Sequence, residues 1–246
     1  MTSRGLPSTI LIVLTGVVIA VALYAAFLYA PTEHTMGTIQ RIFYFHVPAG
    51  MVGISAFLLV FVGSLAFLLT RNLKWDRFAE ASAEVGLLYT TIVLITGPIW
   101  AKPVWGIWWT WDARLTSTLV LWFIYWAYVL IRSYVARPAR RALLSAVVGV
   151  LGAVDAPIVY FSIRWWRTQH PAPVIGGDSG SGLEPRMRVA WMLALVGYIL
   201  LFAAFVVIRT RLARVENELE EVARSIDEDG SVLGAVAAPA QERSSS

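Results

Sequence analysis

The segment PVWGIWWTWDARLT, residues 103–116, contains four tryptophans within seven residues, and an aspartate and an arginine follow closely. Indole rings gather at membrane interfaces, where the ring stays in the apolar region and its N–H meets water. Such belts recruit scattered residues, an interpretation that suits Trp75, Trp100 and Trp191. A dense run favours a different role, a flat aromatic platform for a large planar ligand, with an interfacial belt as the alternative.

Two local conformations would each build such a platform. On a helix, Trp105, Trp108, Trp109 and Asp112 share one face, because their spacing is i, i+3, i+4 and i+7. On an extended strand, Trp105, Trp109 and Trp111 share one side instead. These five residues are therefore the candidate ligand surface.

Three histidines, His34, His46 and His170, are candidates for binding a metal carried by that ligand. Imidazole is the usual protein ligand of haem iron, and two imidazoles can occupy both axial positions. His46 in RIFYFHVPAG and His170 in RWWRTQHPAPV lie among aromatic residues and arginines, whereas His34 has no such context and is expected at the surface. A zinc site is a weaker candidate, since the histidines lack a carboxylate cluster. The pattern predicts haem ligation by His46 and His170.

Three arginines could bind the propionates of such a haem, because a guanidinium presents a planar fork that matches a carboxylate. They are Arg41, Arg114 and Arg167, which lie near the histidines and tryptophans in sequence. Each arginine taken alone is better explained as a lipid headgroup contact. The chain has no cysteine, which excludes a Cys-x-x-Cys-His attachment site. The predicted cofactor is therefore non-covalent haem b.

These residues must be positioned by membrane-spanning helices. The 246-residue chain is 58% hydrophobic and only 15% charged, with a mean hydropathy of +0.66, values that exclude an ordinary soluble domain. A helix that crosses about 30 Å of hydrocarbon needs about 20 apolar residues. Such runs occur at 8–30, 47–70, 80–100, 116–135, 141–163 and 188–209. The predicted fold class is an all-α polytopic membrane protein with six transmembrane helices.

Basic residues distinguish the two sides of the membrane. They occur in alternate connections, at Arg4 and in 71–77, 132–141 and 209–214. By the positive-inside rule, these segments and both termini are cytoplasmic. The opposite loops, 31–46, 101–115 and 164–187, hold every histidine and the tryptophan run, so we expect them to meet on one outer face. The basic residues form no patch, so despite the net charge of +4 the expected surroundings are a lipid bilayer and no nucleic acid.

Prolines mark the expected helix boundaries. Pro48 suits the first turn of the second span, which places His46 at the entrance of that helix. Pro98 is expected to end or kink the third span. Asp155 and Pro157 lie within the fifth span, where we interpret the carboxylate as a partner for backbone groups freed by a proline kink. A functional role for this intramembrane carboxylate is the alternative.

The chain divides into a membrane domain, residues 1–210, and a cytoplasmic extension, residues 211–246. From Leu212 to Ile226, apolar residues step by three and four between glutamates, a pattern that indicates a continued helix. Two heptads are fewer than the three or four that a coiled coil needs. Residues 227–246 are polar and rich in small residues, and we expect a flexible tail.

Three segments together resemble one known family. RIFYFHVPAG, GPIWAKPVWGIWWTWDARLTS and VYFSIRWWRTQHP are similar to corresponding places in the haem (heme) exporter protein C family, tryptophan-rich haem-handling proteins of cytochrome c maturation. The resemblance covers about residues 8–210. It implies that His46 and His170 are the axial ligands, that segment 105–116 cradles the haem edge, and that Arg114 helps to hold the propionates.

The resemblance also implies a role. Haem would be displayed on the periplasmic face of the bacterial inner membrane and passed to a membrane-anchored haem chaperone. ATP-binding cassette transporter subunits and a small membrane subunit of the same complex would assist, and no enzymatic activity is expected. Three alternatives stay open: a membrane subunit of a haem lyase complex, a permease component that translocates haem, and a passive assembly subunit. A permease would carry polar groups at the midplane of several helices, whereas the second and fourth spans are almost wholly apolar.

Overall fold

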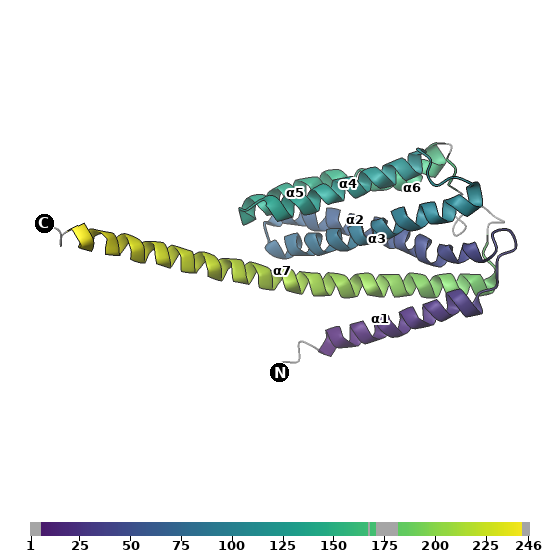
Figure 1. The fold of residues 1–246 in the computed structure, drawn as a ribbon, viewed down its shortest axis with the longest axis horizontal. Coiled ribbons are helices and arrows are strands. Elements are labelled where there is room, and N and C mark those ends of the chain that lie inside the picture. Colours follow the sequence, from purple (N-terminus) through teal and green to yellow (C-terminus); the bar gives the residue numbers. More distant parts are fainter. Residues whose placement is uncertain (1–5, 167, 171–181, 243–246) are drawn as a thin grey trace.

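The computed structural model describes residues 6–166, 168–170 and 182–242, and every regular element in this part of the chain is a helix (Figure 1). The elements are α1 (Leu6–Tyr24), the π-helix η1 (Ala25–Tyr29), the 3-10 helix η2 (Thr38–Ile42), α2 (Phe43–Thr70), α3 (Leu73–Trp105), α4 (Ala113–Tyr134), α5 (Pro138–Gly152), α6 (Asp155–Trp165) and α7 (Pro185–Glu242).

Six helical segments of the described chain are long and apolar enough to cross a bilayer. They are Ser8–Tyr29, Thr38–Thr70, Leu73–Trp105, Ala113–Tyr134, Pro138–Trp165 and Pro185–Ala223. The prediction of an all-α polytopic membrane protein with six spans is confirmed. Helix α1 and η1 together form the first span, and α5 and α6 together form the fifth.

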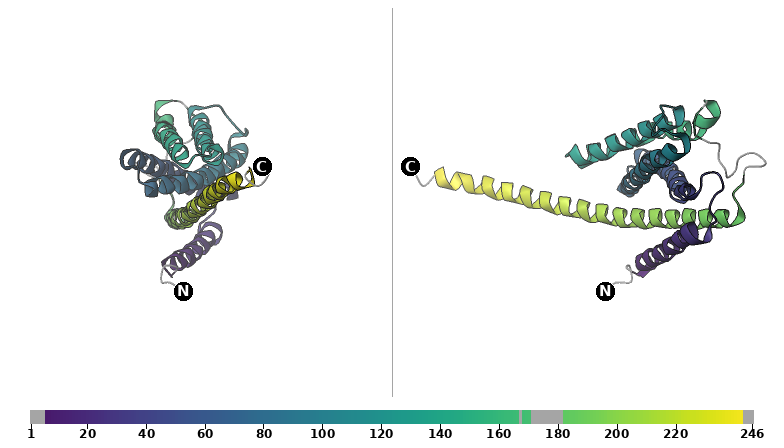
Figure 2. Two further views of the ribbon diagram at one scale, coloured as in Figure 1. Left: turned by 90° about the vertical axis from the view of Figure 1, so that its left-hand side faces the viewer. Right: turned by 45° about the vertical axis from the view of Figure 1, so that its right-hand side comes forward.

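The antiparallel pair α2 and α3 forms the centre of the bundle. Helices α4, α5 and α6 cover one side of this pair, α7 covers the other side, and α1 packs on the outer face of α7 (Figure 1, Figure 2). Glycines allow α2 and α3 to approach closely, since a Cβ atom at Gly86 would lie 2.9 Å from the Cβ of Ala56. Small residues at helix contacts are typical of membrane bundles, where close van der Waals packing replaces the hydrophobic driving force.

Two helix boundaries differ from the sequence prediction. Helix α2 begins at Phe43, so Pro48 is its sixth residue and the placement of that proline in the first turn is wrong. The buried rings of Phe43 and Tyr44 extend the helix towards the N-terminus, because their packing outweighs the backbone hydrogen bond that Pro48 cannot donate. Helix α3 likewise continues through Pro98 to Trp105.

The fifth span is broken, and α6 begins at Asp155. Pro157 is the third residue of α6, a position where its missing N–H has no helical acceptor to lose. The proline therefore lies in the first turn of a new helix, and the prediction of a kink within one helix is wrong. Oδ2 of Asp155 is buried with no hydrogen-bond partner among the described residues, so this oxygen does not satisfy a freed backbone group.

Helix α7 is the longest element, with 58 residues. At 1.5 Å per residue this is about 87 Å, nearly three times the roughly 30 Å thickness of the hydrocarbon core. The helix extends well beyond the other elements towards the C-terminus (Figure 1). It runs on to Glu242, past residue 227, where the sequence predicted that a flexible tail begins.

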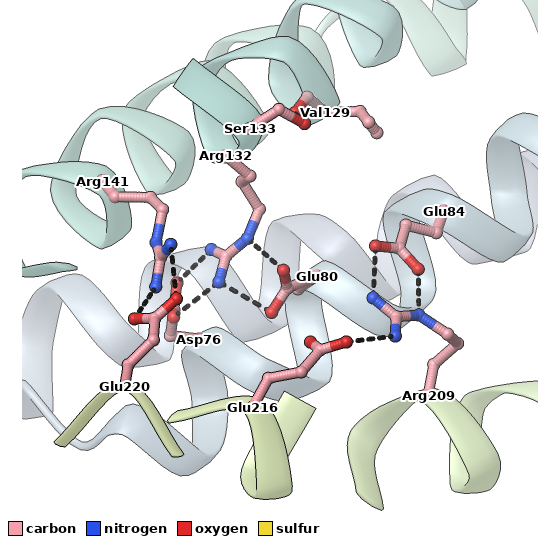
Figure 3. Close-up of polar contacts among 10 residues, drawn as sticks. All are labelled: Asp76, Glu80, Glu84, Val129, Arg132, Ser133, Arg141, Arg209, Glu216 and Glu220. Atoms are coloured by element: carbon pink, nitrogen blue, oxygen red, sulfur yellow. Dashed lines mark hydrogen bonds and ion pairs between the residues drawn. The ribbon is translucent and has the colours of Figure 1, made fainter. Parts of the chain in front are cut away.

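Ion pairs join α3 to α4 and α7 near the N-terminal end of α3 (Figure 3). Arg132 of α4 lies 2.8 Å from Asp76 and 2.6 Å from Glu80 of α3. Arg209 of α7 forms an ion pair with Glu84, one turn further along α3. These contacts fix the relative positions of three spans at the end of the bundle opposite the histidines.

Candidate functional site

Three connections begin at the same end of the bundle: the segment before α2, the segment between α3 and α4, and the described residues 168–170 after α6 (Figure 1). The Asp112 carboxylate joins two of them. Its Oδ1 accepts from the amide N–H of Leu115 at 3.0 Å, which caps α4. Its Oδ2 accepts from the Thr110 hydroxyl at 3.0 Å and from the Gln169 amide at 3.3 Å. One carboxylate thus links the tryptophan segment to the loop that carries His170.

The four tryptophans lie in residues 105–111, and this tryptophan segment is neither helix nor strand beyond Trp105. Trp105 is the last residue of α3, which ends at Gly106 with φ of 78°, and α4 begins only at Ala113. A left-handed φ favours glycine, so Gly106 allows this sharp stop. The intervening residues have no regular secondary structure, and both predicted conformations are therefore wrong for them.

The indole rings of this segment differ in their exposure. Trp108 is 57% exposed and Trp111 is 76% exposed, whereas Trp109 is half-buried. The rings of Trp109 and Trp111 meet edge to face, with centroids 5.7 Å apart and planes at 77°. The Trp109 Nε1 is buried and has no hydrogen-bond partner among the described residues. This pair is therefore angled, unlike the single flat platform that the sequence predicted.

His46 lies in the first turn of α2, with its ring against α3. The Nδ1 atom is 2.9 Å from the Thr96 hydroxyl oxygen. The ring meets Trp100 edge to face at a centroid distance of 5.8 Å. Gly97 faces the same ring so closely that a Cβ atom there would lie 3.3 Å from the His46 Cε1. Three residues of α3 thus hold this imidazole in one orientation.

The other predicted ligand and one predicted propionate contact belong to the same neighbourhood. His46 lies within electrostatic range of His170 and Arg114, whose positive charges would repel a protonated His46 ring. The His170 side chain is half-buried, and its backbone carbonyl accepts from the Thr168 hydroxyl at 3.2 Å. Nη1 of Arg114 donates to the carbonyls of Val159 at 3.3 Å and Tyr160 at 3.5 Å in α6. The structure thus brings two imidazoles and a guanidinium together from α2, α4 and the loop after α6.

The other two predicted propionate contacts are Arg41 and Arg167. Nη1 of Arg41 donates to the Ala26 carbonyl of η1 at 2.5 Å, which connects the first span to the segment before α2. The structure therefore gives Arg41 a role in holding the end of the first span. Arg167 lies outside the described residues.

His34 lies exposed in a turn closed by Glu33. The Glu33 carboxylate accepts from the amide N–H groups of Thr35, at 2.8 Å, and Met36. The Met36 amide holds the pKa of Glu33 below its ordinary value, since it stabilises the charged carboxylate. This turn has its own local hydrogen bonds, so it does not depend on the residues around His46.

The three tryptophans interpreted as an interfacial belt have different environments. Trp75 is 40% exposed, as a belt residue would be. Trp191 is buried in a core cluster with Ala190 and Ala194, so its assignment to the belt is wrong. The indole N–H of Trp100 is also buried, and its ring contacts His46. Trp100 is therefore part of the candidate site.

An apolar cavity of about 180 Å³ lies between α1, α2, α3 and α7, and its lining includes Tyr44, Tyr89, Tyr198 and Phe205. Ligand pockets usually measure roughly 300–1,000 Å³, so this cavity is small for a macrocycle. The residues predicted to bind a large planar ligand lie elsewhere, at the end of the bundle that carries the exposed indole rings. The imidazoles there could coordinate iron, the rings could contact an apolar face, and the Arg114 guanidinium suits a carboxylate.

Comparisons with known proteins address the family to which the chain belongs. The model of the family described as Heme exporter protein C matches residues 2–225. The Heme exporter protein C of Bradyrhizobium diazoefficiens is 32% identical over 219 residues, which cover 89% of this chain and 80% of that protein. The proteins of the same name from Paracoccus denitrificans and Escherichia coli are 35% identical over 182 residues and 34% identical over 197 residues. These matches cover 74% and 79% of this chain, and 76% and 78% of the respective relatives.

The family match spans all six helical segments and all three histidines. Each of these relatives is at least 30% identical to the chain over more than two thirds of its own length. The chain therefore belongs to the haem exporter protein C family.

Proposed function

We propose that the chain binds haem b non-covalently at the end of the bundle that carries the histidines. We further propose that it delivers this haem to a membrane-anchored haem chaperone for the production of c-type cytochromes. Family membership supports a role in haem handling during cytochrome c maturation. The observation that carries the site assignment is the grouping of His46, His170 and Arg114 beside exposed tryptophans.

Each residue has a distinct part in this proposal. His46 and His170 supply the two axial nitrogen ligands of the iron. Arg114 binds a propionate through its planar guanidinium, with Arg41 and Arg167 as further candidates. Asp112 holds the tryptophan segment and the loop that carries His170 in position, because its carboxylate accepts hydrogen bonds from both Leu115 and Gln169.

The exposed indoles supply a contact surface for the haem edge and for the chaperone. Trp108 and Trp111 are the most exposed rings of the segment, and Trp105 is 36% exposed. Aromatic rings of this kind bury a large area on binding and lose little conformational entropy, so they are enriched at binding surfaces. Trp109 packs edge to face against Trp111 and so supports the exposed Trp111 ring.

The proposed location is the bacterial inner membrane, with both termini in the cytoplasm and the histidine end facing the periplasm. This orientation rests on the basic residues, which lie in the connections at the opposite end of the bundle. The further proposed partners are the transporter and small membrane subunits implied by the family resemblance. The chain acts in this proposal by binding and transfer, without an enzymatic step of its own.

Substitution of each histidine tests the ligand assignment. We expect His46→Ala and His170→Ala to lower the haem content of the purified protein by about 10-fold or more. Loss of a supporting partner alone typically costs 10–100-fold in metal affinity, and loss of a ligand is at least as severe. His34→Ala is the matched control, because this exposed histidine lies in a separate turn and should retain normal haem content. The visible spectrum gives the readout, and equal haem content in all three variants would contradict the assignment.

A further inference from the structure

We propose that Thr96 is a positioning residue that selects one tautomer of His46, with the proton on Nδ1 and the lone pair on Nε2. The inference rests on the proposed function in one respect, that His46 is a ligand of haem iron. The tautomer itself is a property of the protein alone. The observation that carries it is a pair of short contacts that meet at one hydroxyl oxygen.

The hydroxyl of Thr96 has a single proton, and the structure assigns that proton a partner. Its Oγ1 donates to the Ile92 carbonyl, one turn back along α3, at 2.7 Å. The same Oγ1 lies 2.9 Å from the His46 Nδ1. Because its proton points to Ile92, the oxygen can meet Nδ1 only as an acceptor. The imidazole must then carry its proton on Nδ1, which gives a chain from His46 to Thr96 to Ile92.

The opposite tautomer fits this geometry poorly. If Nδ1 were the acceptor, the Thr96 proton would have to turn away from Ile92 towards the ring. Two oxygen atoms would then remain 2.7 Å apart with no proton between them, which is repulsive. The Nε2 atom would carry a hydrogen and could not coordinate iron. The observed arrangement therefore favours the only neutral form of His46 that leaves Nε2 able to bind a metal.

Thr96 determines which nitrogen of His46 carries the proton, and two neighbours of Thr96 on α3 fix the orientation of the His46 ring. Gly97 lies against Cε1, where an added Cβ atom would be 3.3 Å away, and Trp100 meets the ring edge to face. The edge formed by Nδ1 and Cε1 therefore lies against α3. Two positively charged or titratable groups from other elements lie within electrostatic range of His46, namely His170 after α6 and Arg114 on α4.

Two substitutions of the same residue separate the hydrogen bond from the packing. Thr96→Val keeps the shape and branching of the side chain but removes the acceptor, so the packing of α3 should change little. Thr96→Ser keeps the hydroxyl and loses only a methyl group. A purely structural role for Thr96 would make the two variants similar or would favour valine, whereas the proposed role predicts that only serine behaves like the wild type.

The first measurement uses haem-free, full-length protein in detergent micelles with ¹⁵N-labelled histidine. The ¹⁵N chemical shifts of the imidazole nitrogens report which one carries the proton, and the signals of His46 are identified by their loss in His46→Gln. We expect His46 to be protonated on Nδ1 in the wild type and in Thr96→Ser. In Thr96→Val we expect a mixture of tautomers. Protonation on Nε2 in the wild type, or the same tautomer in all three proteins, would overturn the inference.

The second measurement is a haem titration that separates this inference from the proposed function. We expect Thr96→Val to bind haem about 10-fold more weakly than wild type, since such partners of a metal-binding histidine typically contribute 10–100-fold in affinity. We also expect a more positive reduction potential, because a histidine that donates no hydrogen bond is a poorer donor to ferric iron. Thr96→Ser should restore both values to near those of the wild type.

The outcomes of the titration are distinct. If Thr96→Val binds haem as tightly and with the same potential as wild type while His46→Ala fails to bind, the positioning role is wrong and the proposed function stands. If His46→Ala binds haem like wild type, the ligand assignment is wrong, whatever tautomer the haem-free protein shows.

Discussion

Helix α3 carries polar or aromatic residues at four-residue intervals near both ends, and the two sets have different partners. Near its N-terminus, Asp76, Glu80 and Glu84 face arginines of α4 and α7 (Figure 3). Near its C-terminus, Thr96 and Trp100 face the imidazole of His46. The first set is closed by ion pairs within the protein. The second set orients the imidazole ring of the proposed iron ligand.

The exposure of the side chains also differs between the two ends of α3. At the ionic end, the side chains of Arg132 and Asp76 are only 8% and 7% exposed. At the histidine end, Trp108 and Trp111 are largely exposed, although indole rings favour burial. Large exposed aromatic surfaces beside oriented polar groups are typical of binding sites. One end of α3 thus fixes the bundle through buried ion pairs, and the other end carries the proposed ligand site.

The largest expected effect comes from removing the ion pairs near the N-terminus of α3. Arg132→Met removes the partner of Asp76 and Glu80, and both carboxylates are then left buried without a counter-charge. Loss of one partner of a buried ion pair typically destabilises a protein by about 3–5 kcal/mol. We expect a decrease of that size in the free energy of unfolding, measured by chemical denaturation in detergent micelles.

The control for this prediction is Arg141→Met. Arg141 of α5 pairs with Glu220 of α7 at 3.1 Å, but the Glu220 side chain is 46% exposed. Exposed ion pairs contribute about 0–1 kcal/mol, so the decrease should be small. Equal losses in the two variants would show that burial does not distinguish the two pairs and would contradict the contrast between the ends of α3.

The next effect, on function, comes from removing exposed rings at the histidine end. Trp108→Ala combined with Trp111→Ala should change the unfolding free energy by under about 0.5 kcal/mol per site, since exposed residues contribute little to the fold. We expect a retained bis-histidine spectrum at reduced occupancy. Delivery should fall further, by roughly 10-fold, because aromatic contacts are each worth about 0.5–1.5 kcal/mol beyond the area they bury.

The measurement for this double variant is the amount of haem-loaded chaperone in cells, compared with the haem content of the purified protein. Trp75→Ala is the matched control, because Trp75 is 40% exposed but lies at the other end of α3. Normal delivery by a stably inserted double variant would show that the exposed rings form only an interfacial belt.

Much of this fold follows from the sequence because a membrane span has a strong local signature. About 20 consecutive apolar residues identify a span without knowledge of its partners. The errors lie at the boundaries, where tertiary packing decides. The buried rings of Phe43 and Tyr44 start α2 early, and α3 continues through Pro98, because neighbouring helices stabilise turns that local propensity disfavours.

The candidate site was only partly predictable. His46, His170 and the tryptophan run are visible as unusual residues, but Thr96 is an ordinary threonine in an apolar span. It becomes important through a contact with a residue 50 positions away, which no single sequence displays. Its position one turn before Trp100, on the same helical face, is the one local indication that it lies at the site.

The smallest expected effect concerns Asp112, whose carboxylate has two separable tasks. Oδ1 caps α4, and Oδ2 accepts the Gln169 amide of the histidine-bearing loop. Asp112→Ala removes both of these contacts and the one with the Thr110 hydroxyl, and it should lower the free energy of unfolding by about 1 kcal/mol, the usual contribution of an N-cap. Asp112→Asn should cost less, because asparagine is also a good N-cap, but its amide group replaces one acceptor oxygen with a donor.

The two Asp112 variants should therefore differ in stability and agree in haem binding. Both lose the acceptor for Gln169, and one net hydrogen bond is worth about 1 kcal/mol, or roughly a fivefold increase in the Kd for haem. Denaturation gives the stability, and titration of each purified variant with haem gives the Kd. If Asp112→Asn binds haem as tightly as wild type, the contact with Gln169 does not position His170. The carboxylate would then serve only to begin α4, and the loop after α6 would have to be held by other contacts.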